Sequence, residues 1–204
     1  MNYINFFKFL KDKEGKKIPD YINTMYYASQ NPDYRLTQDQ IDGFIDEKGN
    51  MRPPNMVLLK VFPDNAKIKG NLDVAEAQGT PIELPDNLTV EGNLEGWDSK
   101  ISFLPNNLTV LGNVIISYTP TLRFLGKNIK VGGELLLHNT ELESLPKDLK
   151  VGTRLTIANT PFLKTLRNKY PTLSDDEISQ KLKSVFPGVN YIHLGQSNNG
   201  IVPY

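Results

Sequence analysis

Two segments of this chain read almost alike: Leu84-Pro85-Asp86-Asn87-Leu88-Thr89-Val90-Glu91-Gly92-Asn93-Leu94 and Leu104-Pro105-Asn106-Asn107-Leu108-Thr109-Val110-Leu111-Gly112-Asn113-Val114. Two further copies follow at residues 125–131 and 145–151, and a partial copy precedes them at residues 68–74. Self-similarity at a fixed period is the sequence signature of a repeat architecture. We therefore expect one structural unit for each copy.

The copies are regularly spaced, and their internal period is two. Equivalent valines lie 20, 21 and 20 residues apart, at Val90, Val110, Val131 and Val151. Alternation such as Leu155 and Ile157 places apolar side chains on one face of a short strand. One unit cannot cover its own aliphatic side chains, so stacked units forming a β-solenoid are predicted. The alternative, a β-sandwich, does not explain why Leu-Pro and Val-x-Gly recur in phase.

Three residue types recur at fixed places in the unit. The glycines at 70, 92, 112 and 133 are predicted to let the chain turn or kink between short strands, because glycine has few conformational restrictions. The prolines that follow Leu84, Leu104 and Leu145 prevent a helix at the return corner. The threonines at 119, 140 and 160 are expected to form a polar ladder, with hydroxyls bonded to the backbone of neighbouring coils.

The N-terminal segment, residues 1–67, has helical signals and many aromatic residues. Helices are expected near residues 4–10 and 21–27, and Thr37 with Gln40 forms a capping box before Ile41, Phe44 and Ile45. Gly49 is predicted to end that helix. Two interpretations stay open: a helical cap that packs its aromatic residues on the first coil, and a separate helical domain with its own partner.

The C-terminal segment also has helical signals. Pro161 fits the first position of a helix that runs to Tyr170, and Ser174 with Glu177 opens a second helix that reaches about Phe186. A strand is expected around residues 189–192, followed by a loose tail from residue 196 to residue 204. The predicted fold class is α+β: a short leucine-rich-repeat-like β-solenoid of about five coils at 68–163, with an N-terminal helical cap or small domain at 1–67 and a helical cap and tail at 164–204.

The repeat, together with the helix that starts Ser174-Asp175-Asp176-Glu177-Ile178, resembles a group of leucine-rich-type repeat proteins from bacteriophage and bacterial genomes. The resemblance covers roughly residues 68–190 and implies a phage or bacterial origin with a non-catalytic role in binding or assembly. A structural component of a virion is one concrete version of that role. The Leu-Pro-rich repeats of secreted bacterial effectors are more distantly similar, but the added Val-x-Gly step departs from their spacing and the ligase-type cysteine is missing.

Composition excludes several classes of function. Lys and Arg total 23, as do Asp and Glu, so no net field favours nucleic acid or an anionic membrane. The absence of cysteine excludes disulfides, thiolate catalysis and cysteine zinc sites. Lys8, Lys11 and Asp12 interrupt the first apolar stretch too early for a signal peptide, and no apolar run is long enough to span a membrane. We therefore expect a cytoplasmic protein, in the host cell or in a virion.

The sequence contains few patterns typical of metal-binding or catalytic sites. His138 and His193 have no second ligand at metal-binding spacing, and the acidic residues at 39, 42, 46 and 47 do not follow a calcium-loop pattern. No phosphate-binding loop or nucleophile motif occurs. His138 shares a repeat column with Trp97, Ser117 and Ala158, and the varied residue types suggest a corner or surface position. The prediction is a protein that is not an enzyme and has no metal, no cofactor and no small-molecule substrate.

Apolar side chains at outward positions are the best candidates for a binding site. In the repeat columns, Ile115 lies beside Leu136 with Leu111 near by, and Phe103 lies beside Phe124. An apolar patch on a solenoid face indicates contact with a partner or subunit, packing under the N-terminal segment, or no consequence. The prediction is a protein partner or homo-oligomer bound through these five residues. A phage or bacterial inhibitor that blocks a host protein through the same face is the alternative.

Overall fold

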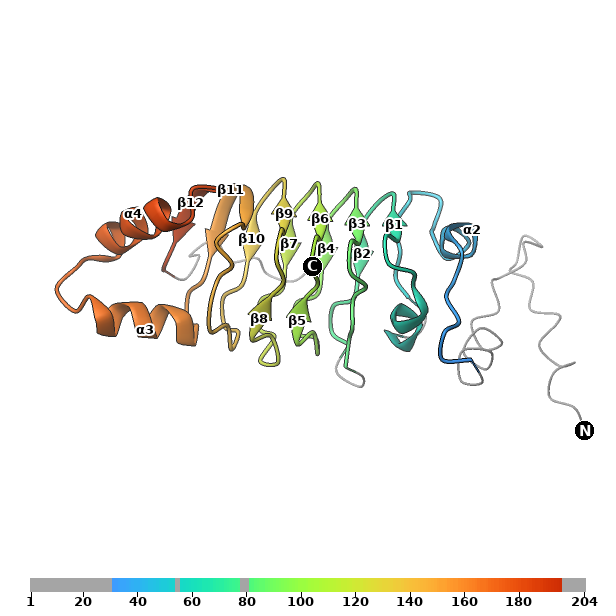
Figure 1. Ribbon diagram of the computed structural model, residues 1–204, viewed down its shortest axis with the longest axis horizontal. Coiled ribbons are helices and arrows are strands. Elements are labelled where there is room, and N and C mark those ends of the chain that lie inside the picture. Colours follow the sequence, from blue (N-terminus) through green and yellow to red (C-terminus); the bar gives the residue numbers. More distant parts are fainter. Residues whose placement is uncertain (1–30, 54–55, 78–80, 196–204) are drawn as a thin grey trace, which may run out of the picture.

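The computed structural model describes residues 31–53, 56–77 and 81–195, and it is a parallel β-solenoid of about four turns (Figure 1). Two-residue strands stack into ladders along its length. The first ladder contains β1 (Lys67–Ile68), β3 (Thr89–Val90), β6 (Thr109–Val110) and β9 (Lys130–Val131). The second ladder contains β2 (Leu72–Asp73), β4 (Leu94–Glu95), β7 (Val114–Ile115) and β10 (Leu135–Leu136). The third ladder is the pair β5 (Phe103–Leu104) and β8 (Phe124–Leu125).

The first two ladders join in one strand near the C-terminal end. The strand β11 (Lys150–Thr156) pairs with β9 through its first residues and with β10 through its last residues. In earlier coils the corresponding stretch is broken into two strands. The final strand, β12 (Val189–His193), lies parallel to β11, so the sheet continues beyond the last predicted repeat.

The stacking predicted from the repeat period is confirmed. Residues in one file of the first ladder pair directly from coil to coil: Ile68, Val90, Val110, Val131, Val151 and Val189. A second file runs through Met51, Leu72, Leu94, Val114, Leu135, Leu155 and Ile192. Both files are buried in one continuous core. The stack therefore begins at Met51 and ends at Ile192, outside the predicted boundaries of 68 and 163.

Gly70, Gly92, Gly112 and Gly133 lie in bends between the strands of the first and second ladders, as predicted, but the reason for glycine there is close packing between coils. None of Gly70, Gly92 and Gly112 has a positive φ, but a Cβ on Gly92 would lie 2.3 Å from Oδ1 of Asn71 and 2.7 Å from the carbonyl carbon of Gly70. These positions therefore need glycine because successive coils approach closely. The left-handed positions before the first ladder are occupied by asparagines, with φ of 59°, 56° and 57° at Asn87, Asn107 and Asn128.

Asparagine also forms the main ladder of side-chain hydrogen bonds. Each Oδ1 accepts a hydrogen bond from the backbone amide one coil further on, at 3.1, 2.7, 2.9 and 2.8 Å, in the series Asn50, Asn71, Asn93, Asn113 and Glu134. The predicted threonine ladder is only partly present. Thr119 donates to the carbonyl of Gly96 in the preceding coil, whereas Thr140 and Thr160 donate within their own coils.

In the described part of the N-terminal segment, the capping box is confirmed and the helix length is wrong. Thr37 caps α2 (Gln38–Asp42), which ends at Gly43 and not at Gly49, because the carboxylate of Asp46 accepts hydrogen bonds from the backbone amides of Lys48 and Asn50 and closes a turn. A 3-10 helix, η3 (Met56–Val61), follows. Phe62 is buried in the solenoid core. The helices expected near residues 4–10 and 21–27 lie outside the described residues.

The C-terminal helices are confirmed. Helix α3 (Pro161–Lys169) is capped by Thr160, and α4 (Asp175–Val185) opens with the capping box of Ser174 and Glu177. Helix α4 packs on β12, where the hydroxyl of Ser179 donates a hydrogen bond to the carbonyl of Ile192. The tail expected at residues 196–204 lies outside the described residues.

Candidate protein-binding surface

Phe103 and Phe124 form an exposed aromatic pair on the third ladder. The two residues are direct neighbours in the pairing of β5 with β8. Their side chains point away from the core, while the neighbouring Leu104 is buried. Phe103 is 39% exposed and Phe124 is 50% exposed. Two adjacent rings with this much contact with water are the clearest apolar surface among the predicted residues.

The other three predicted residues lie elsewhere. Ile115 and Leu136 pair with each other on the second ladder, which belongs to a different sheet from the third ladder (Figure 1). Leu111 follows β6 of the first ladder and is 59% exposed. The five residues therefore do not form a single patch, because the repeat register predicts neighbours within a ladder but not the direction in which each ladder faces.

Leu136 is also not an exposed contact residue. It is only 4% exposed, although its neighbour Leu135 occupies the inward position of the same strand. Ile115, one coil earlier, is half-buried. The prediction that Leu136 is available to an external partner is wrong in this structure.

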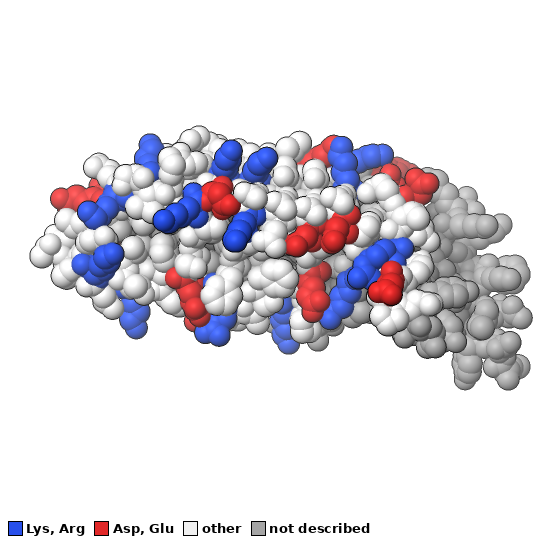
Figure 2. Space-filling view, in the orientation of Figure 1, with Lys and Arg blue, Asp and Glu red and all other residues white. Residues whose placement is uncertain are grey.

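The surroundings of the aromatic pair are polar and of mixed charge. Arg123 forms an ion pair with Glu143 at 2.9 Å, and Lys60 forms one with Glu83 at 3.1 Å. Both pairs are solvent-exposed, and such pairs contribute little to stability. Figure 2 shows basic and acidic side chains interspersed over the face in view. An apolar centre with a polar rim is the usual composition of a protein-binding surface.

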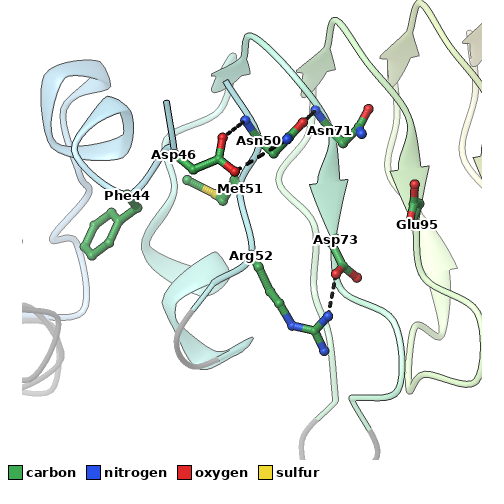
Figure 3. A pocket seen from close by; sticks show the side chains of 8 residues that line it. All are labelled: Phe44, Asp46, Asn50, Met51, Arg52, Asn71, Asp73 and Glu95. Atoms are coloured by element: carbon green, nitrogen blue, oxygen red, sulfur yellow. Dashed lines mark hydrogen bonds and ion pairs between the residues drawn. The ribbon is translucent and has the colours of Figure 1, made fainter. Parts of the chain in front are cut away.

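A shallow polar pocket of about 380 Å³ lies at the N-terminal end of the second ladder (Figure 3). It is lined by Phe44, Asp46, Asn50, Met51, Arg52, Asn71, Asp73 and Glu95. The guanidinium of Arg52 is paired with the Asp73 carboxylate at 2.5 Å. The backbone amide of Asn50 holds the pKa of Asp46 below its usual value, so that carboxylate stays ionised. Within the pocket, Arg52 and Asp73 thus form an ion pair, and Asp46 is hydrogen-bonded to backbone amides.

Sequence reasoning missed one arrangement with chemical potential. Oγ of Ser117 lies 3.1 Å from Nδ1 of His138 in the next coil, and desolvation lowers the pKa of His138. A hydroxyl hydrogen-bonded to a neutral imidazole has two of the groups needed for nucleophilic catalysis, a nucleophile and a general base. Within the described residues, however, no carboxylate hydrogen-bonds to the imidazole to orient it. The ring of Tyr118 instead packs edge-to-face with the imidazole of His138, and 5.2 Å separate the two ring centroids.

The signal for this contact was present in the sequence. Ser117 and His138 belong to one repeat column, and the period alone places such residues on adjacent coils. Of the two predicted positions for that column, corner or surface, the corner is observed: each member directly precedes a residue with positive φ, and Ser117 and Ala158 are 3% and 1% exposed.

Comparison with protein-family models, with curated proteins and with solved structures found no match. Among the described residues, no three His, Asp or Glu side chains lie close enough together to hold a metal ion. In the same part of the chain, no helix has the length and apolar character needed to cross a bilayer.

Proposed function

We propose that this chain is a non-catalytic binding or assembly protein that presents its third ladder to a protein partner. The observation that carries the proposal is the pair of exposed rings at Phe103 and Phe124 on adjacent strands. Aromatic residues that project from a rigid scaffold are typical anchors of protein interfaces. The partner would supply an apolar surface at the centre of the contact and polar groups at its edge.

The scaffold supports this role because it is preorganised. Successive coils are fixed to each other by parallel strand pairing and by the buried aliphatic files, and from Asn50 to Glu134 also by the asparagine ladder. A surface that does not reorganise on binding avoids part of the entropy cost of association. Completing the burial of each ring would contribute about 1 kcal/mol, since burying a whole phenylalanine contributes about 1.5–3 kcal/mol.

The biological setting follows from the sequence resemblance alone. The similarity of residues 68–190 to repeat proteins of phage and bacterial genomes favours a role in assembly, with a virion component as the specific form. A phage or bacterial inhibitor that blocks a host protein is the alternative. Co-purification with particles in fixed stoichiometry supports the first, whereas recovery as a free complex with one host protein supports the second.

The test compares a double variant of the aromatic pair with a single variant on another surface. Phe103→Glu with Phe124→Glu alters the third ladder, and Leu111→Glu is the control because Leu111 is equally apolar and more exposed but lies on the first ladder. Partners are captured by photo-crosslinking from an unnatural residue at Ser144, beside the ring pair, and are then purified for titration. The double variant should weaken binding at least about 30-fold, from the loss of about 2 kcal/mol, while the control retains it.

Equal affinity of the double variant for the purified partner would contradict the proposal. Self-association that the double variant abolishes would replace the external partner with a second copy of this chain.

A further inference from the structure

Charged side chains are unevenly distributed along the solenoid. Residues 31–116 carry 7 basic and 13 acidic side chains, whereas residues 117–195 carry 11 basic and 7 acidic side chains. The coils stack in sequence order, so this difference becomes a difference between the two ends of the stack (Figure 1). The N-terminal half of the stack is therefore acidic and the C-terminal half is basic, although the whole chain has a formal net charge of zero.

One column of residues shows this change of sign from coil to coil. Three positions before the first residue of each strand in the first ladder, and of β11, lie Asp64, Asp86, Asn106, Lys127 and Lys147. Two hydrogen bonds hold the middle of the column in register. The backbone amide of Asn106 donates to Oδ1 of Asp86 at 2.8 Å, and the backbone amide of Lys127 donates to Oδ1 of Asn106 at 3.0 Å. We call these five residues the corner column.

The charged members of the corner column are available to a partner. Asp64, Lys127 and Lys147 are exposed, and Asp86 is half-buried. Within the described residues, none of these four charged groups is in an ion pair. The corner column therefore presents two carboxylates, a neutral centre and two ammonium groups, in that order along the solenoid.

This order of charges is complementary to itself when it is reversed. In a two-fold dimer whose chains run antiparallel, residues equally far from the axis on opposite sides face each other. With the axis at the coil of Asn106, Asp86 faces Lys127 of the second copy and Asp64 faces Lys147, and each contact occurs twice. A nucleic acid or an anionic membrane would be attracted to the basic half and repelled by the acidic half, so neither fits the whole column.

An exposed leucine lies in the same central coil. Leu111 follows β6 and is 59% exposed, and it points outward because the preceding Val110 is buried. In the antiparallel arrangement, Leu111 meets the same residue of the second copy at the axis. An apolar contact with charged groups around it is the usual composition of a protein interface. One like-charge contact results, between Lys67 and Lys150, and the carboxylate of Glu91, 2.6 Å from Nζ of Lys67, offsets it.

We infer that two copies of this chain associate antiparallel through the corner column and Leu111. From Asp64 to Lys147 the column advances by four strand spacings, roughly 19 Å, so the interface is small and the association is weak. The chain is therefore monomeric at the low concentrations used to titrate a partner or to follow unfolding. The inference is independent of the proposed function, which concerns the third ladder.

The test uses one charge reversal at each end of the column, in the full chain. Asp64→Lys and Lys147→Glu change exposed side chains outside the hydrogen-bonded series of Asp86 and Asn106. Self-association is measured by sedimentation equilibrium up to about 1 mM protein, in about 0.01 M salt, where screening is weak. Each variant alone places like charges opposite each other twice in its homodimer and should weaken association at least about 10-fold. An equimolar mixture of the two variants regains every opposite-charge contact in the heterodimer and should associate as well as the wild type.

The control is Lys164→Glu, which makes the same change in net charge as Lys147→Glu at an exposed position on α3. It should leave self-association unchanged. A wild-type chain that stays monomeric up to about 1 mM would overturn the inference. So would equal weakening by Lys164→Glu, or a mixture of the two reversals that associates no better than either variant alone.

Discussion

Replacing Gly112 with alanine tests the reason for the recurring glycine. A Cβ at this position would lie 2.3 Å from Oδ1 of Asn93, 2.7 Å from the carbonyl oxygen of Gly92 and 2.9 Å from its carbonyl carbon. Oδ1 of Asn93 can move, but the carbonyl oxygen and carbon of Gly92 belong to backbone that is fixed in the preceding coil. Forcing a methyl group into such a site costs about 1–3 kcal/mol.

A second cost adds to the first. Oδ1 of Asn93 accepts a hydrogen bond from the backbone amide of Asn113 at 2.9 Å, and the new methyl group would displace that oxygen. Losing this bond contributes about 1 kcal/mol more. The expected decrease in the free energy of unfolding for Gly112→Ala is therefore about 2–4 kcal/mol.

The assay is urea unfolding followed by circular dichroism, with Gly195→Ala as the matched control. A Cβ at Gly195 would meet only the flexible ring of His193, at 3.4 Å, so its effect should stay within about 0.5 kcal/mol. If glycine were needed at 112 for conformational freedom, its φ would be positive, and it is not. A loss of less than about 0.5 kcal/mol for Gly112→Ala would refute the steric explanation.

Two further predictions concern the core and the half-buried imidazole of His138. Leu94→Ala should lower the free energy of unfolding by about 2–5 kcal/mol, because Leu94 is fully buried in the second-ladder file, whereas Leu111→Ala on the surface should change it by less than about 0.5 kcal/mol; both are measured by urea unfolding. Desolvation lowers the pKa of His138, so the unfolded chain binds a proton more readily than the folded chain. The contribution of His138 to the free energy of unfolding should therefore be fully present above the ordinary histidine pKa of about 6.5 and decrease as the pH falls below it. His138→Gln should remove this pH-dependent contribution, measured in unfolding curves at a series of pH values. A stability that rises below that pH, or a slope unchanged by His138→Gln, would contradict the assignment.

The stacking could be predicted from sequence because it depends on one period. The sequences around Val90 and Val110 repeat, so the two valines were predicted to occupy equivalent positions in adjacent coils. The register of β3 and β6 confirms this prediction. The caps at Thr37 and Ser174 could be predicted because a capping box involves only neighbouring residues. The end of the helix after Thr37 could not, since the Asp46 turn competes with the helix and ends it at Gly43.

The candidate site was less predictable because it depends on how ladders are oriented. The pairing of Phe103 with Phe124 followed from the repeat and is present. That Ile115 and Leu136 lie on a different sheet depends on the corners between the second and third ladders, where Asp98 and Tyr118 have positive φ. The burial of Leu136 could not be predicted from the repeat, because alternation along a strand assigns that position to the outer face.

The asparagine ladder limits how such a protein can change in length. Each coil between Asn71 and Asn113 offers an acceptor to the next coil and a backbone amide to the previous one. A duplicated unit inserted there would meet the same neighbours on both sides and would extend the molecule by about 4.8 Å. After Glu134 the side chain no longer continues the series and instead forms an ion pair with Arg154, so an insertion beyond that point would lack its acceptor. Lengthening is thus permitted within the middle of the array, and the distance between its two ends can be adjusted in steps of one unit.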